Sequence, residues 1–334
     1  MFLALLRSET AQSPERMRAA LAGLRAYQGA ERSAPLPQMP IIARIGRAML
    51  RDYGGSGRPA VFVPSLINPP RVLDLHERSS LLRWLATRGV RPLLVDWGVP
   101  SAEERDLDIG GHVEALLLPL LREIGERVDL VGYCLGGTMA LAAAARHPVA
   151  SLALIATPWH FNGFGSDSRE ALASLWQLAA PAAEQMGVFP MEVLQTAFWQ
   201  LDPARTVTKF ERFGTLDPTS EAAQGFVVLE DWANDGPPLT LAAGRDLLVH
   251  MIGEDRPGQG RWNVAGSAVE PNSIGCPVLD IVSTSDRIVP AASAARLGET
   301  IELALGHVGM VVGSRAGTEL WEPLAGWLSQ LRKP

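Results

Sequence analysis

The sequence predicts an α/β fold in which a mostly parallel sheet carries helices on both faces. The first observation is an alternation of short apolar runs with helical segments, which starts at residue 60. Parallel strands need crossover connections, usually helices, so this alternation is typical of such a sheet. The second is a strand-to-helix turn around Cys134, and the third is a break in the alternation between Pro158 and Pro277. A large insertion therefore interrupts the sheet-forming part of the chain.

Each predicted strand is an apolar run of strand length, and helical segments separate most of these runs. The strands are expected over 60–63, 91–97, 128–131, 149–156, 277–283 and 300–305. The helices are expected over 79–88, 111–126, 135–146, 291–297 and 318–331. Strands that are buried on both faces have continuous apolar runs, so helices should cover both sides of the sheet.

The chain divides into three predicted parts. Residues 1–58 form an N-terminal helix and a linker, residues 59–158 and 271–334 form the core, and residues 159–270 form a cap inserted into it. An insertion at this point lies near the carboxyl ends of the parallel strands, where ligands bind in such folds. A lid over a substrate pocket is expected, and a cap without a gating role is the alternative.

Inside the insertion, the sequence indicates helices over 168–180 and 191–200 and no convincing strand–helix pairs. Large aromatic rings need burial, so the insertion has its own packed interior or covers the active face. Five of the nine tryptophans fall here, namely Trp159, Trp176, Trp199, Trp232 and Trp262.

The N-terminal helix is predicted over 14–29, where Met17, Leu21 and Leu24 recur at the spacing of one helix face. We expect it to dock on the outside of the domain, with a surface for a partner or an anchor as the alternative. Closely spaced prolines between residues 35 and 40 then mark the linker.

The composition disfavours several classes of protein. A net charge of −6 and a pI near 5.6 over 334 residues argue against a broad nucleic-acid-binding surface. Two cysteines give no disulfide framework and fit a reducing compartment. The apolar run at residues 2–6 is too short for a signal peptide, and no run approaches a transmembrane helix. A cytoplasmic location is therefore expected.

Residues 132–136, Gly-Tyr-Cys-Leu-Gly, fit the pattern of a nucleophile elbow with cysteine as the nucleophile. Small residues two positions to either side let such a strained turn close. The N-terminus of the helix that begins there favours a thiolate at Cys134. The alternative is that Cys134 is an inert core thiol beside an ordinary turn.

A cysteine nucleophile needs a base, and the base needs an orienting acid. In this architecture the chain order is nucleophile, acid, histidine. Among six histidines, His307 alone follows the last predicted strand, and Asp286 lies on the loop directly after the strand before it. Asp280 lies within that strand and is expected to be structural. A lone turn aspartate or loop histidine would mean little, but three residues in the required order predict a Cys134–Asp286–His307 triad.

The predicted oxyanion hole consists of two backbone N–H groups, those of Leu135 and Ile67. Leu135 follows the nucleophile, and Ile67 lies in the loop after the first predicted strand of the core. The sequence contains no Cys/His spacing typical of metal sites, no Walker loop and no G-x-G-x-x-G motif. Neither a metal nor a bound cofactor is expected.

These features together resemble the polyhydroxyalkanoate synthases of the α/β-hydrolase superfamily, particularly the short catalytic subunit that lacks a long N-terminal region. The resemblance runs from about residue 60 to the C-terminus and is weakest across the insertion. The matching motifs are 63–68 (Val-Pro-Ser-Leu-Ile-Asn), 72–75 (Val-Leu-Asp-Leu), 94–98 (Leu-Val-Asp-Trp-Gly), the cysteine box 132–137, the acid loop 286–290 and the histidine loop 306–309. One difference is Arg287, where family members usually have a histidine.

The resemblance implies an α/β-hydrolase fold with a largely helical cap. It also implies acyl transfer from a 3-hydroxyacyl-CoA, through an acyl-Cys134 intermediate, to a hydroxyl acceptor. Coenzyme A is then part of the substrate and not a cofactor. A second synthase subunit or a homodimer, and the surface of a polymer granule, are the partners that the resemblance implies, so the cytoplasmic protein would be granule-associated.

Two other functions are compatible with the same residues. A thioester, ester or polyester hydrolase would use the same triad and release free hydroxy acid without making polymer. A non-catalytic binding subunit of a granule complex would carry a Cys134 that resists thiol reagents at neutral pH.

Overall fold

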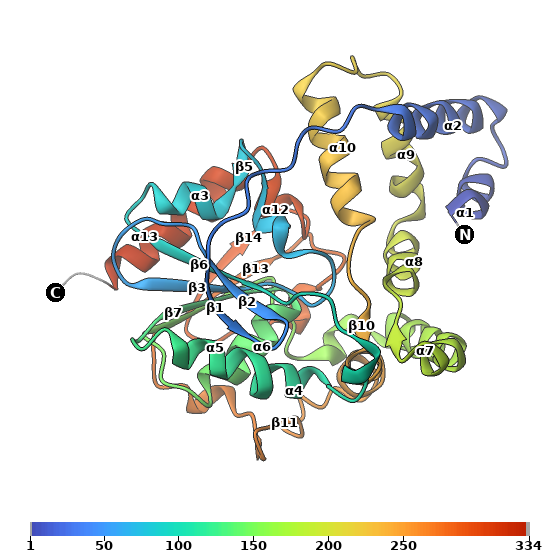
Figure 1. The fold of residues 1–334 in the computed structure, drawn as a ribbon. Coiled ribbons are helices and arrows are strands. Elements are labelled where there is room, and N and C mark those ends of the chain that lie inside the picture. The colour runs from blue at the N-terminus through green and yellow to red at the C-terminus, as the bar shows by residue number, and fades with distance from the viewer. Residues whose placement is uncertain (1, 332–334) are drawn as a thin grey trace.

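The computed structural model describes residues 2–331, which form an eight-stranded sheet covered by helices on both faces (Figure 1). Neighbouring strands from β6 to β14 run parallel, as predicted. In spatial order the strands are β1 (Ile41–Ile45), β2 (Ala48–Asp52), β6 (Arg91–Asp96), β3 (Pro59–Val63), β7 (Asp129–Tyr133), β8 (Ser151–Ile155), β13 (Val278–Ser283) and β14 (Glu299–Leu303).

Alternating side chains of each strand enter the two layers of the core. Along β3, Val61 and Val63 pack with one layer, whereas Ala60 and Phe62 pack with the other. The first layer includes α4 (Ile109–His112), α5 (Leu118–Glu123) and α6 (Leu135–Ala144). The second includes α3 (Leu81–Ala86), α12 (Gly309–Val312) and α13 (Glu322–Gln330).

Two sequence expectations for the core need correction. Residues 41–52, expected as linker, form the hairpin β1–β2, which joins the edge of the sheet antiparallel to β6. Arginines interrupt the apolar pattern of this hairpin, and Arg51 pairs with Asp96 of β6 at 2.9 Å. The helix expected over 291–297 is only a short turn, Ala291–Ser293. Its continuation is prevented because Arg296 has a φ of 51° and its N–H is bound to Asp280.

The insertion is mainly helical, and the helices predicted at 168–180 and 191–200 are confirmed and longer than expected. They are α7 (Ser166–Met186) and α8 (Met191–Leu201). Further helices follow, namely α9 (Pro203–Phe213), α10 (Glu221–Ala233) and α11 (Leu241–Arg245), which continues as a helix to Gly253. Paired two-residue strands complete it, β9 (Val188–Phe189) with β10 (Leu239–Thr240) and β11 (Asn263–Val264) with β12 (Ser267–Ala268).

The helix predicted at 14–29 is confirmed as α2 (Pro14–Gly29), and it docks on α9 of the insertion (Figure 1). A helix that was not predicted, α1 (Phe2–Glu9), precedes it. Gly23 allows the close approach, because a Cβ at this position would lie 1.8 Å from the carbonyl oxygen of Phe210. The N-terminal segment therefore packs against the helical insertion, and its linker crosses to the sheet. Along residues 2–331, none of the helices combines the length and the apolar character that crossing a membrane requires.

We expect Asp280→Asn to remove a pH-dependent loss of stability. Asp280 is fully buried in β13, and burial raises its pKa from 3.8 to about 6. At pH values between these two pKa values, Asp280 is protonated in the folded state and ionised in the unfolded state. The free energy of unfolding therefore falls as pH rises, by up to about 3 kcal/mol. Urea unfolding between pH 4 and pH 7 should show the variant gaining stability relative to the wild type. A difference that stays constant with pH would contradict this assignment.

Candidate active site

Cys134 occupies a sharp turn between β7 and α6, with a φ of 58° and a ψ of −133°. The turn closes only because the residues two positions before and after Cys134 are glycines. A Cβ at Gly132 would lie 2.3 Å from the Cα of Gly137, and one at Gly136 would lie 2.1 Å from the carbonyl oxygen of Val63. Residues 132–136 thus have the geometry of a nucleophile elbow, in which the sulfur is presented beyond the end of the strand.

Asp286 and His307 follow the neighbouring strands β13 and β14 and meet beside this turn. The Nδ1 atom of His307 lies 2.5 Å from Oδ2 of Asp286, and both side chains are buried. The other carboxylate oxygen of Asp286 accepts hydrogen bonds from the backbone N–H groups of Ile288 and Val289, at 2.8 and 3.0 Å. The loop therefore fixes the carboxylate, and the carboxylate fixes the orientation of the imidazole ring.

Cys134 and His307 line the same cavity, and the charge of Cys134 acts on the His307 ring, so the structure brings the three predicted residues together. Burial opposes a charge on the ring, whereas the negative charges of Cys134 and Asp286 and the hydrogen bonds to both favour it. The net effect raises the pKa of His307 to about 10. A protonated His307 is therefore available to donate a proton at neutral pH. The catalytic roles of the three residues remain predictions.

Tyr133 is a further part of the site that the sequence did not single out. Its ring stacks on the His307 ring with centroids 5.1 Å apart, and its hydroxyl donates to the carbonyl oxygen of His307 at 3.2 Å. Burial raises the pKa of Tyr133 well above its usual value, so the hydroxyl stays protonated. The sequence feature that could have identified Tyr133 is its position directly before the nucleophile, because the residue there ends the strand beside the histidine loop.

The two N–H groups predicted to form the oxyanion hole differ in their hydrogen-bond partners. Leu135 is the first residue of α6, so its N–H is among those that have no partner within the helix. The N–H of Ile67 donates to the hydroxyl of Ser65 at 3.0 Å and would have to leave it to reach a substrate. The pairing of Leu135 with Ile67 stays a prediction.

A cavity of about 630 Å³ lies over Cys134 and His307, between the strand ends and the helical insertion. This volume is in the range that holds one drug-sized ligand, roughly 300–1,000 Å³. Lys209 and Glu230 also line it and neutralise each other at 2.7 Å. Apolar side chains from the insertion that line the cavity include Phe161, Phe164, Leu172, Leu194, Phe198 and Leu248.

Arg287, next to Asp286, also lines this cavity and contacts the insertion. Its Nη1 atom lies 2.5 Å from Oδ2 of Asp202, the residue that caps the N-terminus of α9. Because the arginine side chain is 65% exposed, this ion pair contributes only about 0–1 kcal/mol to stability. Within residues 2–331, no group of three or more His, Cys, Asp or Glu side chains is placed to hold a metal ion.

We expect Asp286→Asn to reduce kcat for a p-nitrophenyl ester by on the order of 10³–10⁴-fold, because the amide no longer holds the required imidazole tautomer or stabilises its charge. Asp280→Asn is the matched control, since it changes a buried carboxylate within β13, the strand that precedes the Asp286 loop. An Asp286→Asn enzyme within tenfold of the wild type would exclude the predicted role of this carboxylate.

Comparison with known proteins places this geometry in a family. Residues 60–320 match the sequence model of the Alpha/beta hydrolase family. Two solved structures share the fold: BpoC from Mycobacterium tuberculosis (TM-score 0.56, 15% identity, 87% of this chain and 99% of that one) and a thermophilic esterase from Thermogutta terrifontis (TM-score 0.50, 17% identity, 90% and 100%). The predicted α/β-hydrolase fold is thereby confirmed.

Curated relatives share one name, poly(3-hydroxyalkanoate) polymerase subunit PhaC. The protein of Allochromatium vinosum is 29% identical over 81% of each chain, and that of Haloarcula marismortui is 27% identical over 81% of this chain. The alignment spans 61% of the Haloarcula protein, so this chain matches only part of that relative. The chain belongs to the alpha/beta hydrolase family, and its resemblance to the polyhydroxyalkanoate synthases is confirmed.

Proposed function

We propose that this protein is an acyltransferase that builds polyhydroxyalkanoate from 3-hydroxyacyl-CoA. The observation that carries the proposal is the meeting of Cys134 with the His307–Asp286 pair under a mainly apolar cavity. The names of the curated relatives support the substrate class. A second synthase subunit, a homodimer contact and a granule surface belong to the same proposal.

In the first half of the proposed reaction, the sulfur of Cys134 attacks the thioester carbonyl as a thiolate while its proton is held on His307. The N–H of Leu135 donates to the oxygen on which negative charge develops. The C–S bond of the CoA thioester breaks, His307 returns the proton to the departing CoA thiolate, and the acyl group remains on Cys134. Asp286 stabilises the charged imidazole throughout.

In the second half, another 3-hydroxyacyl unit presents its hydroxyl group to His307. The ring accepts the hydroxyl proton while the oxygen attacks the acyl-cysteine carbonyl. An ester C–O bond forms, the C–S bond to Cys134 breaks, and His307 keeps the proton beside the released sulfur, which restores the starting state. Exchange between two thioesters is nearly balanced in free energy, so cysteine can accept acyl groups from CoA and keep them available for transfer.

Arg287 favours one alternative, a hydrolase with the same triad. Family members usually have histidine at this position, and here the side chain binds Asp202 of the insertion instead. Water would then take the place of the hydroxyl acceptor, and the product would be free hydroxy acid.

The test is to incubate the protein with 3-hydroxybutyryl-CoA, following free CoA and analysing the acyl product by mass spectrometry. We expect oligomeric ester to form with the wild type, while Cys134→Ala loses activity by on the order of 10⁴-fold or more because it cannot form the acyl-enzyme. CoA release that yields only monomeric hydroxy acid would establish the hydrolase. CoA release that survives in Cys134→Ala would refute both functions.

A further inference from the structure

A second cavity of about 1370 Å³ lies beside the first, and Asn68 and Pro69 line both. We call it the linker groove, because the linker residues 32–39 form one of its sides. The other sides come from the loop at 68–78, the outer face of α10 and the segment 235–238 that follows this helix. The groove thus starts where the Cys134 cavity ends.

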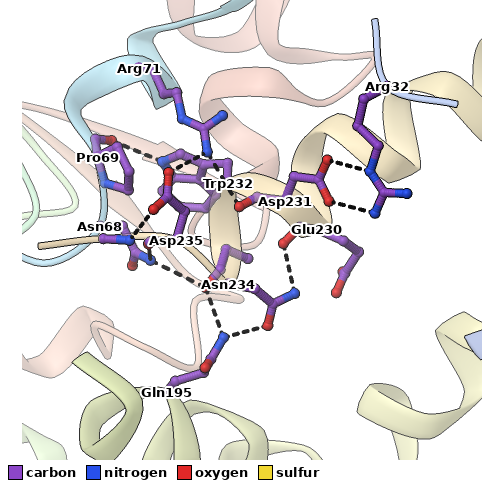
Figure 2. A network of polar contacts seen from close by, with 12 residues as sticks. Arg32, Asn68, Pro69, Arg71, Gln195, Glu230, Asp231, Trp232, Asn234 and Asp235 are labelled. Carbon is purple, nitrogen blue, oxygen red and sulfur yellow. Dashed lines mark hydrogen bonds and ion pairs between the residues drawn. The ribbon is translucent and has the colours of Figure 1, made fainter. Parts of the chain in front are cut away.

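The wall between the two cavities is made of side-chain hydrogen bonds across two segments (Figure 2). The amide of Asn68 donates to the carbonyl oxygens of Ala233 and Asp235, at 3.3 and 3.1 Å. On the same wall, Trp232 Nε1 donates to the carbonyl oxygen of Pro69 at 2.9 Å. Moving the Asn68 side chain alone would break two hydrogen bonds and no strand pairing and would leave the buried Trp232 in place, so the wall can open at Asn68 at modest cost.

The positive charges that line the linker groove are neutralised. Its lining includes four arginines, and each is paired with a carboxylate. Burial lowers the pKa of His76, which also lines the groove, so this ring is neutral at pH 7. Phosphate groups are bound by available cations, so the groove suits a neutral ligand better than the phosphates of CoA. The pairs are Arg32–Asp231, Arg51–Asp96, Arg71–Asp235 and Arg78–Glu221.

The proposed reaction needs such a second space. During elongation an ester chain is attached to Cys134 while the next acyl-CoA enters the same cavity. At about 630 Å³, that cavity has the size of a site for one ligand. A chain of several units therefore has to extend into neighbouring space, and the linker groove shares a wall with the cavity.

We propose that the linker groove binds the growing polyester chain, a neutral chain of hydroxyacyl esters, and that the wall at Asn68 separates it from the Cys134 cavity. This inference rests on the proposed function and adds the site that holds its product. It also gives a role to the N-terminal linker, which would contact the chain.

Gly225 allows the groove to be filled without touching the Cys134 cavity. It lies within α10 and lines the groove, and a Cβ at this position meets no atom within 4 Å. Gly225→Trp therefore places an indole ring in open groove space. Ala222→Trp is the matched control, because it adds the same ring to the same helix at an exposed position that lines neither cavity.

The probes are a linear octamer and a dimer of 3-hydroxybutyrate, each capped as a neutral ester. Their binding is measured by calorimetry on full-length protein that carries Cys134→Ala, so that no turnover occurs. We expect Gly225→Trp to weaken octamer binding at least about tenfold, or about 1.4 kcal/mol, and to leave dimer binding unchanged. Ala222→Trp should change neither, and octamer affinity should vary little with salt because the ligand is uncharged.

Equal octamer affinity in Gly225→Trp and the wild type would overturn the proposal, as would an octamer that does not bind. Because the probes need no chemistry at Cys134, this result is independent of the CoA-release assay. A protein that binds the octamer in the groove but never releases CoA would keep the groove and refute the proposed reaction.

Discussion

The close packing of α6 against the ends of β3, β7 and β8 is the constraint on which the rest of the site depends. A Cβ at Gly137 would lie 1.8 Å from Oγ1 of Thr157, so glycine is needed where α6 crosses β8. The hydroxyl of Thr138 donates to the carbonyl oxygen of Pro158 at 2.6 Å and holds the same contact. The positive φ of Cys134 costs on the order of 1–3 kcal/mol, which this surrounding structure offsets.

The same packing links the elbow to the loop that faces it. Trp97 is buried under the loop after β3 and donates from Nε1 to the carbonyl oxygen of Pro64 at 3.0 Å. Asn68, four residues later, holds the opposite end of this loop against the insertion. The backbone between them contains Ile67, so the position of the insertion and the position of a predicted oxyanion donor are mechanically connected. A displacement of the insertion would therefore be transmitted to the backbone at Ile67, which lines the Cys134 cavity.

Charge is distributed unevenly between the site and its surroundings. Beside Cys134, the carboxylate of Asp286 balances the positive charge of the protonated His307 ring, and Tyr133 stays neutral. Away from the sulfur, Lys209 is paired with Glu230 and Arg287 with Asp202. The cavity thus concentrates its electrostatic effect at the reacting atoms and offers a largely apolar surface to an acyl chain.

The amino-acid sequence was enough to predict the elements whose signal is local. Continuous apolar runs predicted the parallel strands, and the glycines around Cys134 predicted the elbow, because both patterns depend on neighbours in the chain. The order of Cys134, Asp286 and His307 predicted which residues meet, since the carboxyl ends of neighbouring parallel strands lie together. The motif 63–68 and the cysteine box were enough to indicate the resemblance that the comparisons confirmed.

Features that depend on contacts between separate segments became visible in the folded structure. The apolar pattern of the hairpin β1–β2 is interrupted by Arg44, Arg47 and Arg51, and the hairpin is stabilised by pairing with β6. The expected helix after Pro290 gives way because Asp280, on the preceding strand, accepts a hydrogen bond from the backbone N–H of Arg296. The stacking of Tyr133 on His307 and the wall at Asn68 join segments more than 150 residues apart. Such contacts leave no periodicity in the sequence, because the energy that fixes them comes from residues that only folding brings together.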